Sequence, residues 1–249
     1  MKNPPWLLVA ADLQPEVGQT IDLDPSEARH TTGPLRRRPG DRVVLADGEG
    51  LVAQAVIRVV ENKRVEVEVL AVRAEDPPCG EGVSVALAVV GNQAMDWAVQ
   101  KLVEVGTRRV LPILTERTQA GSRTAAGRSA HWRRVALQSL KQCRRPWAMD
   151  IAEVCRLDDV VVAERSGRGV VVAHPDGVAV VDLPAAAGRL LVVGPEGGFS
   201  PAEDRLFSDL GWPWVRLGAH TLRSETAAVV GAAMLVAMDD GRCGVKGEG

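Results

Sequence analysis

From Val83 to Met238, apolar runs as long as buried strands alternate with segments whose apolar residues recur at helical spacing. The helical segments also carry start and stop residues, such as Ser200 before Pro201 and Gly106 after the first of them. Strand candidates span residues 83–90, 109–115, 169–174, 189–194 and 214–218; helix candidates span about 94–105, 129–145, 200–210 and 225–238. This alternation predicts an α/β fold with a mainly parallel sheet covered by helices on both faces.

The first part of the chain has a different pattern. Residues 42–46, 51–60 and 64–72 read as strands, with Asp47-Gly48 as a hairpin signal and with polar and apolar residues alternating from Arg64 to Leu70. Pro77-Pro78-Cys79-Gly80 then interrupts the chain and is typical of a linker. We therefore predict a small β domain over residues 1–74 and an α/β domain over residues 75–249.

Composition excludes several classes of protein. The chain has 46% hydrophobic and 25% charged residues and no apolar run long enough to cross a bilayer. Its N-terminus lacks the pattern of a signal peptide, so a cytoplasmic location is expected. The four cysteines and four histidines are scattered, which predicts neither a disulfide framework nor a metal site.

Positive charge is concentrated although the net charge is −2. Between Lys101 and Arg145 there are eleven basic and only two acidic residues, and Arg36–Arg38 form a second basic run. Local charge determines the field that a phosphate meets, so these segments favour contact with a polyanion. The alternative is a solvated helix face.

The stretch Gly194-Pro-Glu-Gly-Gly-Phe-Ser-Pro-Ala-Glu203 follows a buried strand and precedes a capped helix. The P-loop, the dinucleotide-binding G-x-G-x-x-G and the hydrolase G-x-S-x-G are all absent from the chain. Two readings stay open: a ligand held by main-chain groups that glycine lets approach, or a structural turn. Residues 173–175 and 217–227 form the other two candidate loops; there Arg223 and Glu225 can be a simple ion pair, or Glu225 can favour the helix dipole.

Motifs spread from about residue 29 to residue 235 carry a family resemblance. "LLVVGPEGGFSPAE" with "VRLGAHTLRSETAA" closely resembles the paired C-terminal signature of the uracil-N3 methyltransferases of 16S ribosomal RNA, in the SPOUT superfamily. "RHTTGPLRRRPGDRVVLADGEG" is similar to the family's N-terminal PUA-like domain. "MDWAVQKLVEVGTRRVLPILTERT" and "QSLKQCRRP" are similar to its first helix-to-strand passage and to an Arg-bearing helix end.

The resemblance implies a PUA-like β-barrel, a C-terminal domain with a deep trefoil knot, a homodimer, and S-adenosylmethionine as cofactor. The knot loops of the family bind the cofactor mainly through main-chain groups. The matching positions here are His174, Pro175, Gly194, Pro195, Glu196, Gly197, Gly198, Leu217, Gly218, Leu222, Arg223, Glu225, Thr226 and Ala227. The chain departs from the family at Ser224, where Thr is usual, at His220-Thr221, and at Ala94, where a basic residue is common.

The implied reaction is methylation of N3 of one uridine in 16S ribosomal RNA of the small subunit. We expect Arg223 to face a uracil oxygen where charge builds, and Glu225 and Glu196 to be possible bases or orienting groups. The predicted RNA contacts are Arg29, Arg36, Arg37, Arg38, Arg117, Arg133, Arg144 and Arg145. Two other functions stay open: a SPOUT enzyme acting on another RNA or atom, and a non-catalytic RNA-binding or assembly protein.

Overall fold

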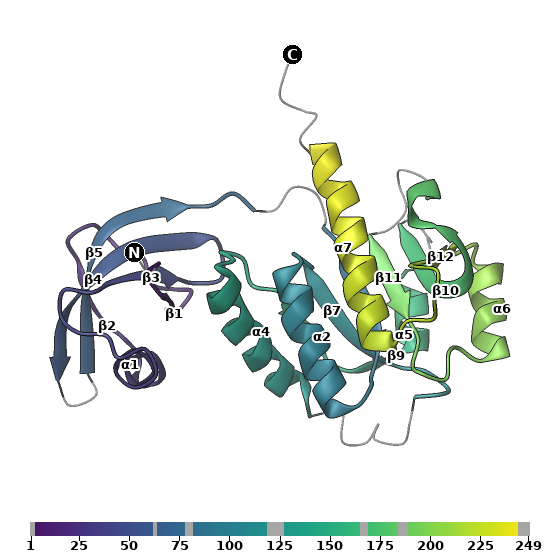
Figure 1. Ribbon diagram of the computed structural model, residues 1–249, viewed down its shortest axis with the longest axis horizontal. Coiled ribbons are helices and arrows are strands. Elements are labelled where there is room, and N and C mark those ends of the chain that lie inside the picture. The colour runs from purple at the N-terminus through teal and green to yellow at the C-terminus, as the bar shows by residue number, and fades with distance from the viewer. Residues whose placement is uncertain are drawn as a thin grey trace, which may run out of the picture. The chain divides into compact units, whose positions relative to one another are not determined.

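The computed structural model describes residues 3–61, 64–77, 82–118, 127–164, 169–183 and 189–243, with side chains up to residue 239. The chain forms two compact units, Met1–Pro77 with Gln138–Ala148, and Pro78–Leu137 with Met149–Gly249 (Figure 1). Residues 78–80 of the predicted linker lie outside the described residues. The domain boundary between residues 74 and 75 stays a prediction.

The N-terminal unit is built on a five-stranded sheet in the order β1-β3-β4-β5-β2. β1 pairs with β3 in parallel and the other pairs are antiparallel. The predicted strands at residues 42–46, 51–60 and 64–72 are confirmed, while the two short strands and the helix α1 were not predicted. The elements are β1 (Trp6–Leu8), β2 (Thr20–Asp22), α1 (Pro25–Thr32), β3 (Arg42–Ala46), β4 (Leu51–Glu61) and β5 (Arg64–Ala74).

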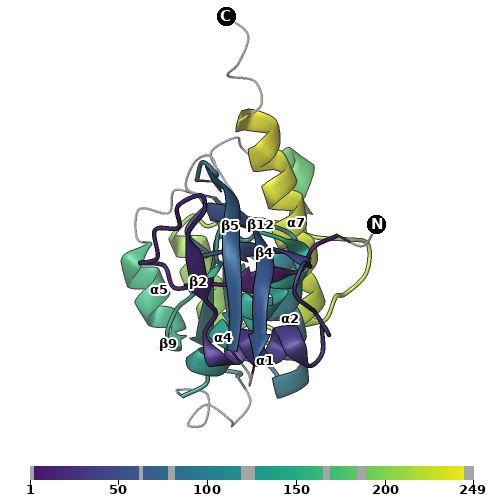
Figure 2. The ribbon, with the colours of Figure 1, turned by 90° about the vertical axis from the view of Figure 1, so that its left-hand side faces the viewer.

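The core of this unit follows from the two-residue repeat of its strands. Val65, Val67 and Val69 of β5 are buried with Leu45 of β3 in one apolar cluster, to which Ala28 of α1 also belongs. Figure 2 shows β4 and β5 as long neighbouring strands with α1 across their lower end. The opposite face of the sheet carries a smaller cluster. It consists of Trp6 of β1, Val44 and Ala46 of β3, and Val52 of β4, which alternate along these strands with residues of the first cluster.

The C-terminal unit contains a sheet of seven strands, and every pair of neighbours in it is parallel. The strand order is β12-β10-β11-β6-β7-β8, and β9 also pairs with β7. The predicted parallel sheet is therefore confirmed. The strands are β6 (Ser84–Ala88), β7 (Arg109–Leu114), β8 (Asp150–Ile151), β9 (Cys155–Arg156), β10 (Val170–Ala179), β11 (Leu190–Val193) and β12 (Trp214–Arg216).

Helices cover both faces of this sheet, as the sequence predicts. Figure 1 shows α2 and α7 side by side in front of the strands, and Leu191 of β11 lies directly against Gly231 of α7. On the other face Val192 of β11 belongs to the same apolar cluster as Val160 of α5 and Phe207 of α6. The helices are α2 (Asn92–Glu104), α5 (Leu157–Ala163), α6 (Pro201–Asp209) and α7 (Ser224–Cys243), with a 3-10 turn over Val180–Asp182. Helix α4 (Ser129–Cys143) begins in this unit, and its residues from Gln138 onward belong to the N-terminal unit.

One predicted boundary is wrong. The strand expected to end at His174 continues as β10 to Ala179. Its pairing with β12 shifts register between Ala173 and Val178, so the residues between them form an irregular, bulged segment within the strand. Pro175, which has no N–H for a ladder, lies in this segment. Ala173 and Val178 both pair with Val215, so the four residues between them bulge out of the ladder and the pairing then resumes. The sequence therefore indicated an irregularity here, but not that the strand resumes after it.

Candidate functional site

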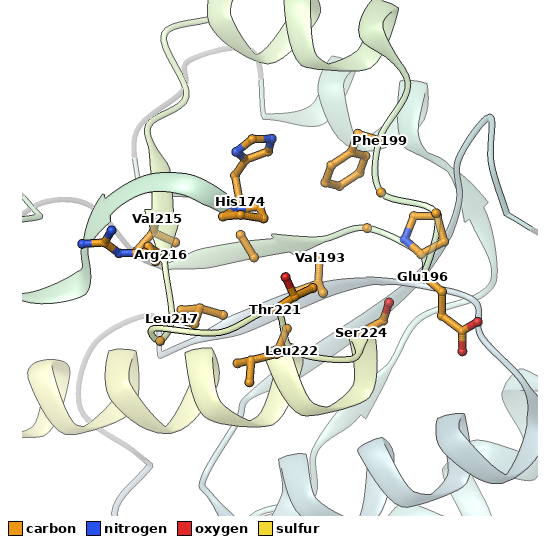
Figure 3. Close-up of a pocket in the computed structure, with 18 of the residues that line it drawn as sticks. His174, Val193, Glu196, Phe199, Val215, Arg216, Leu217, Thr221, Leu222 and Ser224 are labelled. Carbon is orange, nitrogen blue, oxygen red and sulfur yellow. The ribbon is translucent and has the colours of Figure 1, made fainter.

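A cavity of about 440 Å³ lies where β10, β11 and β12 meet their following segments. Its wall comes mainly from three parts of the chain, residues 173–175, 193–199 and 215–222 (Figure 3). Because the three strands are parallel neighbours, segments about 20 residues apart in the sequence come to one edge of the sheet. All three candidate loops of the sequence therefore contribute to one cavity.

The glycine loop ends in the capped helix that the sequence predicts. The Ser200 hydroxyl accepts a hydrogen bond from the Glu203 N–H, and the Glu203 carboxylate accepts one from the Ser200 N–H. Gly198 has a φ of 68°, a conformation that side chains rarely adopt. A Cβ on Gly194 would lie 3.0 Å from the ring of Phe199, so glycine lets strand and loop approach closely.

Arg117, which also lines the cavity, holds the glycine loop. Its Nη1 donates hydrogen bonds to the carbonyl oxygens of Gly197 and Phe199, each at 2.9 Å. The adjacent N–H of Glu116 donates to Oε1 of Glu203 at 2.8 Å. These contacts form a clasp that joins the segment after β7 to the loop after β11. Charge-assisted bonds of this kind are stronger than neutral ones, so the clasp fixes the loop's carbonyl groups.

His174 stands in the bulged part of β10. Its ring stacks on Trp214 with centroids 4.0 Å apart, and its Nδ1 accepts a hydrogen bond from the Asp176 N–H at 3.1 Å. The Nε2 atom therefore carries the proton in the neutral ring. The side chain is 20% exposed and lines the cavity, so it presents a fixed donor and an apolar ring surface there.

The start of α7 closes the cavity from a second side. Ser224 and Ala227 are buried and line the cavity. Glu225 is half-buried in the first turn of the helix, and its Oε2 has no hydrogen-bond partner among the described residues. Arg223 precedes the helix, is exposed, and lies outside the cavity wall.

Most of the residues predicted to bind the cofactor come together. The wall contains His174, Pro175, Gly194, Pro195, Glu196, Gly197, Gly198, Leu217, Gly218, Leu222 and Ala227, whereas Arg223, Glu225 and Thr226 do not line it. Figure 3 shows the exposed carboxylate of Glu196 pointing away from the other labelled side chains. Of the three residues predicted to be catalytic, only Glu196 belongs to the wall; their roles stay predictions.

The arginines predicted to contact RNA fall into both units. Arg29, Arg36, Arg37, Arg38, Arg144 and Arg145 belong to the N-terminal unit, and Arg117 and Arg133 to the C-terminal unit. Arg133 donates to the Ile151 carbonyl and to Glu153, and burial lowers the pKa of the Arg145 guanidinium. Arg36 and Arg144 are the two described non-glycine residues with positive φ, at 49° and 61°.

Some wall residues were not predicted to line the cofactor site. They are Phe199 at the end of the glycine loop, Asp204 in α6, and Arg117, which lies in the segment after β7 and was predicted as an RNA contact. Arg117 and Phe199 lie in motifs that the sequence highlights, but nothing local shows that they meet, because they are 82 residues apart. Asp204 has a buried Oδ1 without a hydrogen-bond partner in the described part of the chain, and no sequence pattern marks it.

The described residues contain no group of three or more His, Cys, Asp or Glu side chains placed to hold a metal ion. No helix in the same part of the chain is both long and apolar enough to span a bilayer.

Comparisons with known proteins identify the family. Residues 78–236 match the family model of the RNA methyltransferase domain. The chain is 33% identical to ribosomal RNA small subunit methyltransferase E of Mycobacterium bovis over 90% of its length and 88% of that protein, and 28% identical to the Aquifex aeolicus protein of that name over 85% and 92%. The structure of ribosomal RNA small subunit methyltransferase E of Neisseria gonorrhoeae bound to S-adenosylmethionine superposes with a TM-score of 0.83, at 27% identity, over 96% of this chain and 98% of that one. The chain belongs to the ribosomal RNA small subunit methyltransferase E family.

Proposed function

We propose that this protein transfers the methyl group of S-adenosylmethionine to N3 of one uridine in the 16S ribosomal RNA of the small subunit, in the cytoplasm. The observation that carries the proposal is the single cavity formed by the three loops that match the family's cofactor motifs. A Neisseria gonorrhoeae relative with the same fold was solved with S-adenosylmethionine bound. The uracil-N3 specificity rests on the resemblance of "GPEGGFSPAE" and "LGAHTLRSETAA" to the signature of that family.

The residues present fit S-adenosylmethionine, which carries no phosphate. The cavity's volume, about 440 Å³, lies within the ~300–1,000 Å³ range of small-molecule sites. Its wall offers glycine main chain at residues 194, 197 and 198, apolar surface at Leu217 and Leu222, and the ring of His174. S-adenosylmethionine, when bound there, supplies an electrophilic methyl group on a sulfonium. The backbone groups of the glycine loop and the apolar side chains would hold the cofactor, and Arg117 would fix the loop that provides the backbone groups.

We further propose that the C-terminal unit is knotted and acts as a homodimer, and that the N-terminal sheet is a PUA-like barrel. The strand order supports the knot. After β11 the chain crosses to β12, which lies on the far side of β10 in the sheet, and α7 then returns to pack on β6 and β11. A second copy is expected to supply part of the RNA-binding face near the start of α7.

In the proposed mechanism, the chain mainly aligns the reacting atoms. Uracil N3–H is weakly acidic, so a nearby group must take its proton or stabilise the anion. Arg223 is exposed outside the cavity wall, which suits contact with a uracil oxygen of the RNA better than contact with the cofactor. Glu225 has a carboxylate oxygen without a hydrogen-bond partner among the described residues, which supports a role for it as an acceptor of a hydrogen bond or of the proton. N3 lies on the pairing edge, so the target base must be unpaired or flipped out.

The test uses small ribosomal subunits from cells that lack this enzyme, the purified protein and labelled S-adenosylmethionine. We expect label in 16S RNA and a new reverse-transcription stop at one uridine, because N3 methylation blocks pairing. Cofactor binding without transfer to these subunits would point to another RNA substrate. A folded protein that neither binds cofactor nor transfers label would refute the proposal and favour a binding or assembly role.

A further inference from the structure

A second cavity lies in the N-terminal unit, apart from the loops described above. It has a volume of about 280 Å³, and every residue that lines it belongs to this unit. Its floor is the small apolar cluster on the second face of the sheet, with Trp6, Val44 and Val52. The volume is close to the lower end of small-molecule sites, ~300 Å³, and leaves room for one group about the size of a nucleotide.

Polar groups surround this apolar floor. Gln54 of β4, Arg73 of β5 and Arg144 after α4 all line the cavity. The Arg73 side chain is 63% exposed and pairs with Glu75 at 3.0 Å. The two Nη atoms of Arg144 lie 2.8 and 3.0 Å from the Asn3 side-chain amide, with the amide oxygen facing them. Each guanidinium has five N–H donors, so both arginines keep donors for a further anion.

The backbone of Arg144 ends a helix. Arg144 follows Cys143, the last residue of α4, its φ is 61°, and the next N–H, of Arg145, donates to the Leu140 carbonyl at 3.2 Å. Many helices end with a residue in this left-handed conformation, and glycine is usual there. Glycine can therefore replace Arg144 without disturbing the end of the helix.

We propose that this cavity binds one unpaired nucleotide of the RNA substrate, with the base on the apolar floor and its phosphate at Arg144 and Arg73. Flat bases favour apolar and aromatic surfaces, an amide such as Gln54 can pair with a base edge, and guanidinium groups suit phosphate. The proposal rests on RNA being the substrate of the proposed function. It adds a contact separate from the methyl-transfer site, which would help to place the target uridine.

The test measures binding of an end-labelled, single-stranded RNA of mixed sequence to the full chain at several salt concentrations. Arg144→Gly removes the guanidinium and fits the left-handed backbone, so loss of folding is not expected. We expect about 3- to 10-fold weaker binding at physiological salt, and a slope of log K against log salt that is smaller by about 0.7, the value for one phosphate contact on a single strand. Arg58→Ala is the matched control, because Arg58 lies on β4, pairs with Glu68 and does not line the cavity.

A second variant tests the base rather than the phosphate. Ala71→Leu adds apolar volume at the exposed Ala71 of the cavity wall without changing charge. The added side chain should prevent one base from stacking, so affinity should fall about fivefold or more while the salt slope stays unchanged. If Ala71→Leu binds RNA like the parent, or if Arg144→Gly keeps the parent's slope, the nucleotide site is refuted.

Binding of S-adenosylmethionine, measured by calorimetry in the same proteins, separates this proposal from the proposed function. Both variants should bind the cofactor as the parent does. If the parent bound RNA with the predicted variant effects but bound no cofactor, the methyltransferase proposal would fail and the nucleotide site would stand.

Discussion

The two sheets of this protein place their polar contacts differently. In the N-terminal unit the chain turns back by hairpins, as between β4 and β5, and its most buried polar contact joins two side chains, Lys141 and Glu27, at 2.7 Å. In the C-terminal unit parallel strands send their following segments to one edge, and the main polar contact there, from Arg117, goes to loop carbonyls. The comparison indicates that a buried ion pair fixes two elements of the first unit, whereas an exposed arginine shapes a ligand site in the second.

The largest expected effect concerns Glu27. Its carboxylate and the Lys141 ammonium are only 6% and 7% exposed, so Glu27→Ala leaves a buried, unpaired cation. The free energy of unfolding of the N-terminal unit should fall by about 3–5 kcal/mol, measured by native-state hydrogen exchange. Cofactor affinity should not change. Glu68→Ala, which breaks an exposed pair with Arg58, is the control and should leave the free energy of unfolding nearly unchanged. If Glu27→Ala lowered the free energy of unfolding no more than the control does, the buried pair would not stabilise the N-terminal unit.

The next effect concerns Arg117. Arg117→Ala removes both bonds to the loop carbonyls, and hydrogen bonds to charged groups are worth ~1.5–3 kcal/mol. The dissociation constant for S-adenosylmethionine should rise about tenfold to a hundredfold in calorimetry. Arg109→Ala is the matched control, because Arg109 lies at the other end of β7 and pairs with Asp150 at 2.9 Å. Equal affinities in the two variants would show that the clasp does not position the cofactor loop.

Gly198 tests the backbone itself. Gly198→Ala meets no atom within 4 Å, so its only expected cost is that of the left-handed conformation, about 1–2 kcal/mol. If the loop relaxes to avoid this cost, cofactor affinity should fall about 5- to 30-fold in a titration. Gly211→Ala has the same φ of 68°, equally open surroundings and no place in the cavity wall. It should lower stability alone; an equal loss of affinity in both variants would contradict a specific role for the loop.

The smallest effect concerns Asp24, which caps α1. Burial raises the pKa of its carboxyl, but the hydrogen bonds from Ser26 and Glu27 outweigh this and lower the pKa below the ordinary value of 3.8. A lowered folded pKa gives stability that is complete above the unfolded pKa and is lost as the pH falls through the folded one. Asp24→Ala should therefore cost ~1 kcal/mol at neutral pH and little below the folded pKa, measured by urea unfolding. A difference that persists in strong acid would contradict this.

Local chemistry is sufficient to predict many elements. The helical spacing of Ala94, Met95, Ala98, Val99, Leu102 and Val103 predicts the apolar face of α2, and all of these residues except the half-buried Ala94 are buried. The capping box at Ser200 and Glu203 correctly placed the start of α6. By contrast, the sequence did not predict β1, β2, β9 or α5. The three strands have only two or three residues each, and α5 is also short, so none of them is long enough for a clear periodic pattern.

The sequence by itself determined the parallel α/β class, the glycine-rich loop and the family, because these depend on patterns within short stretches and on motifs in a fixed order. Only the tertiary structure decided that β10 continues past His174, that Arg223 stays outside the cavity, and that Arg117 holds a loop 80 residues away. The physical reason is that strand order across the sheet brings distant segments together. The residue types along the chain do not specify which distant segments come into contact. The packing of the whole sheet specifies this.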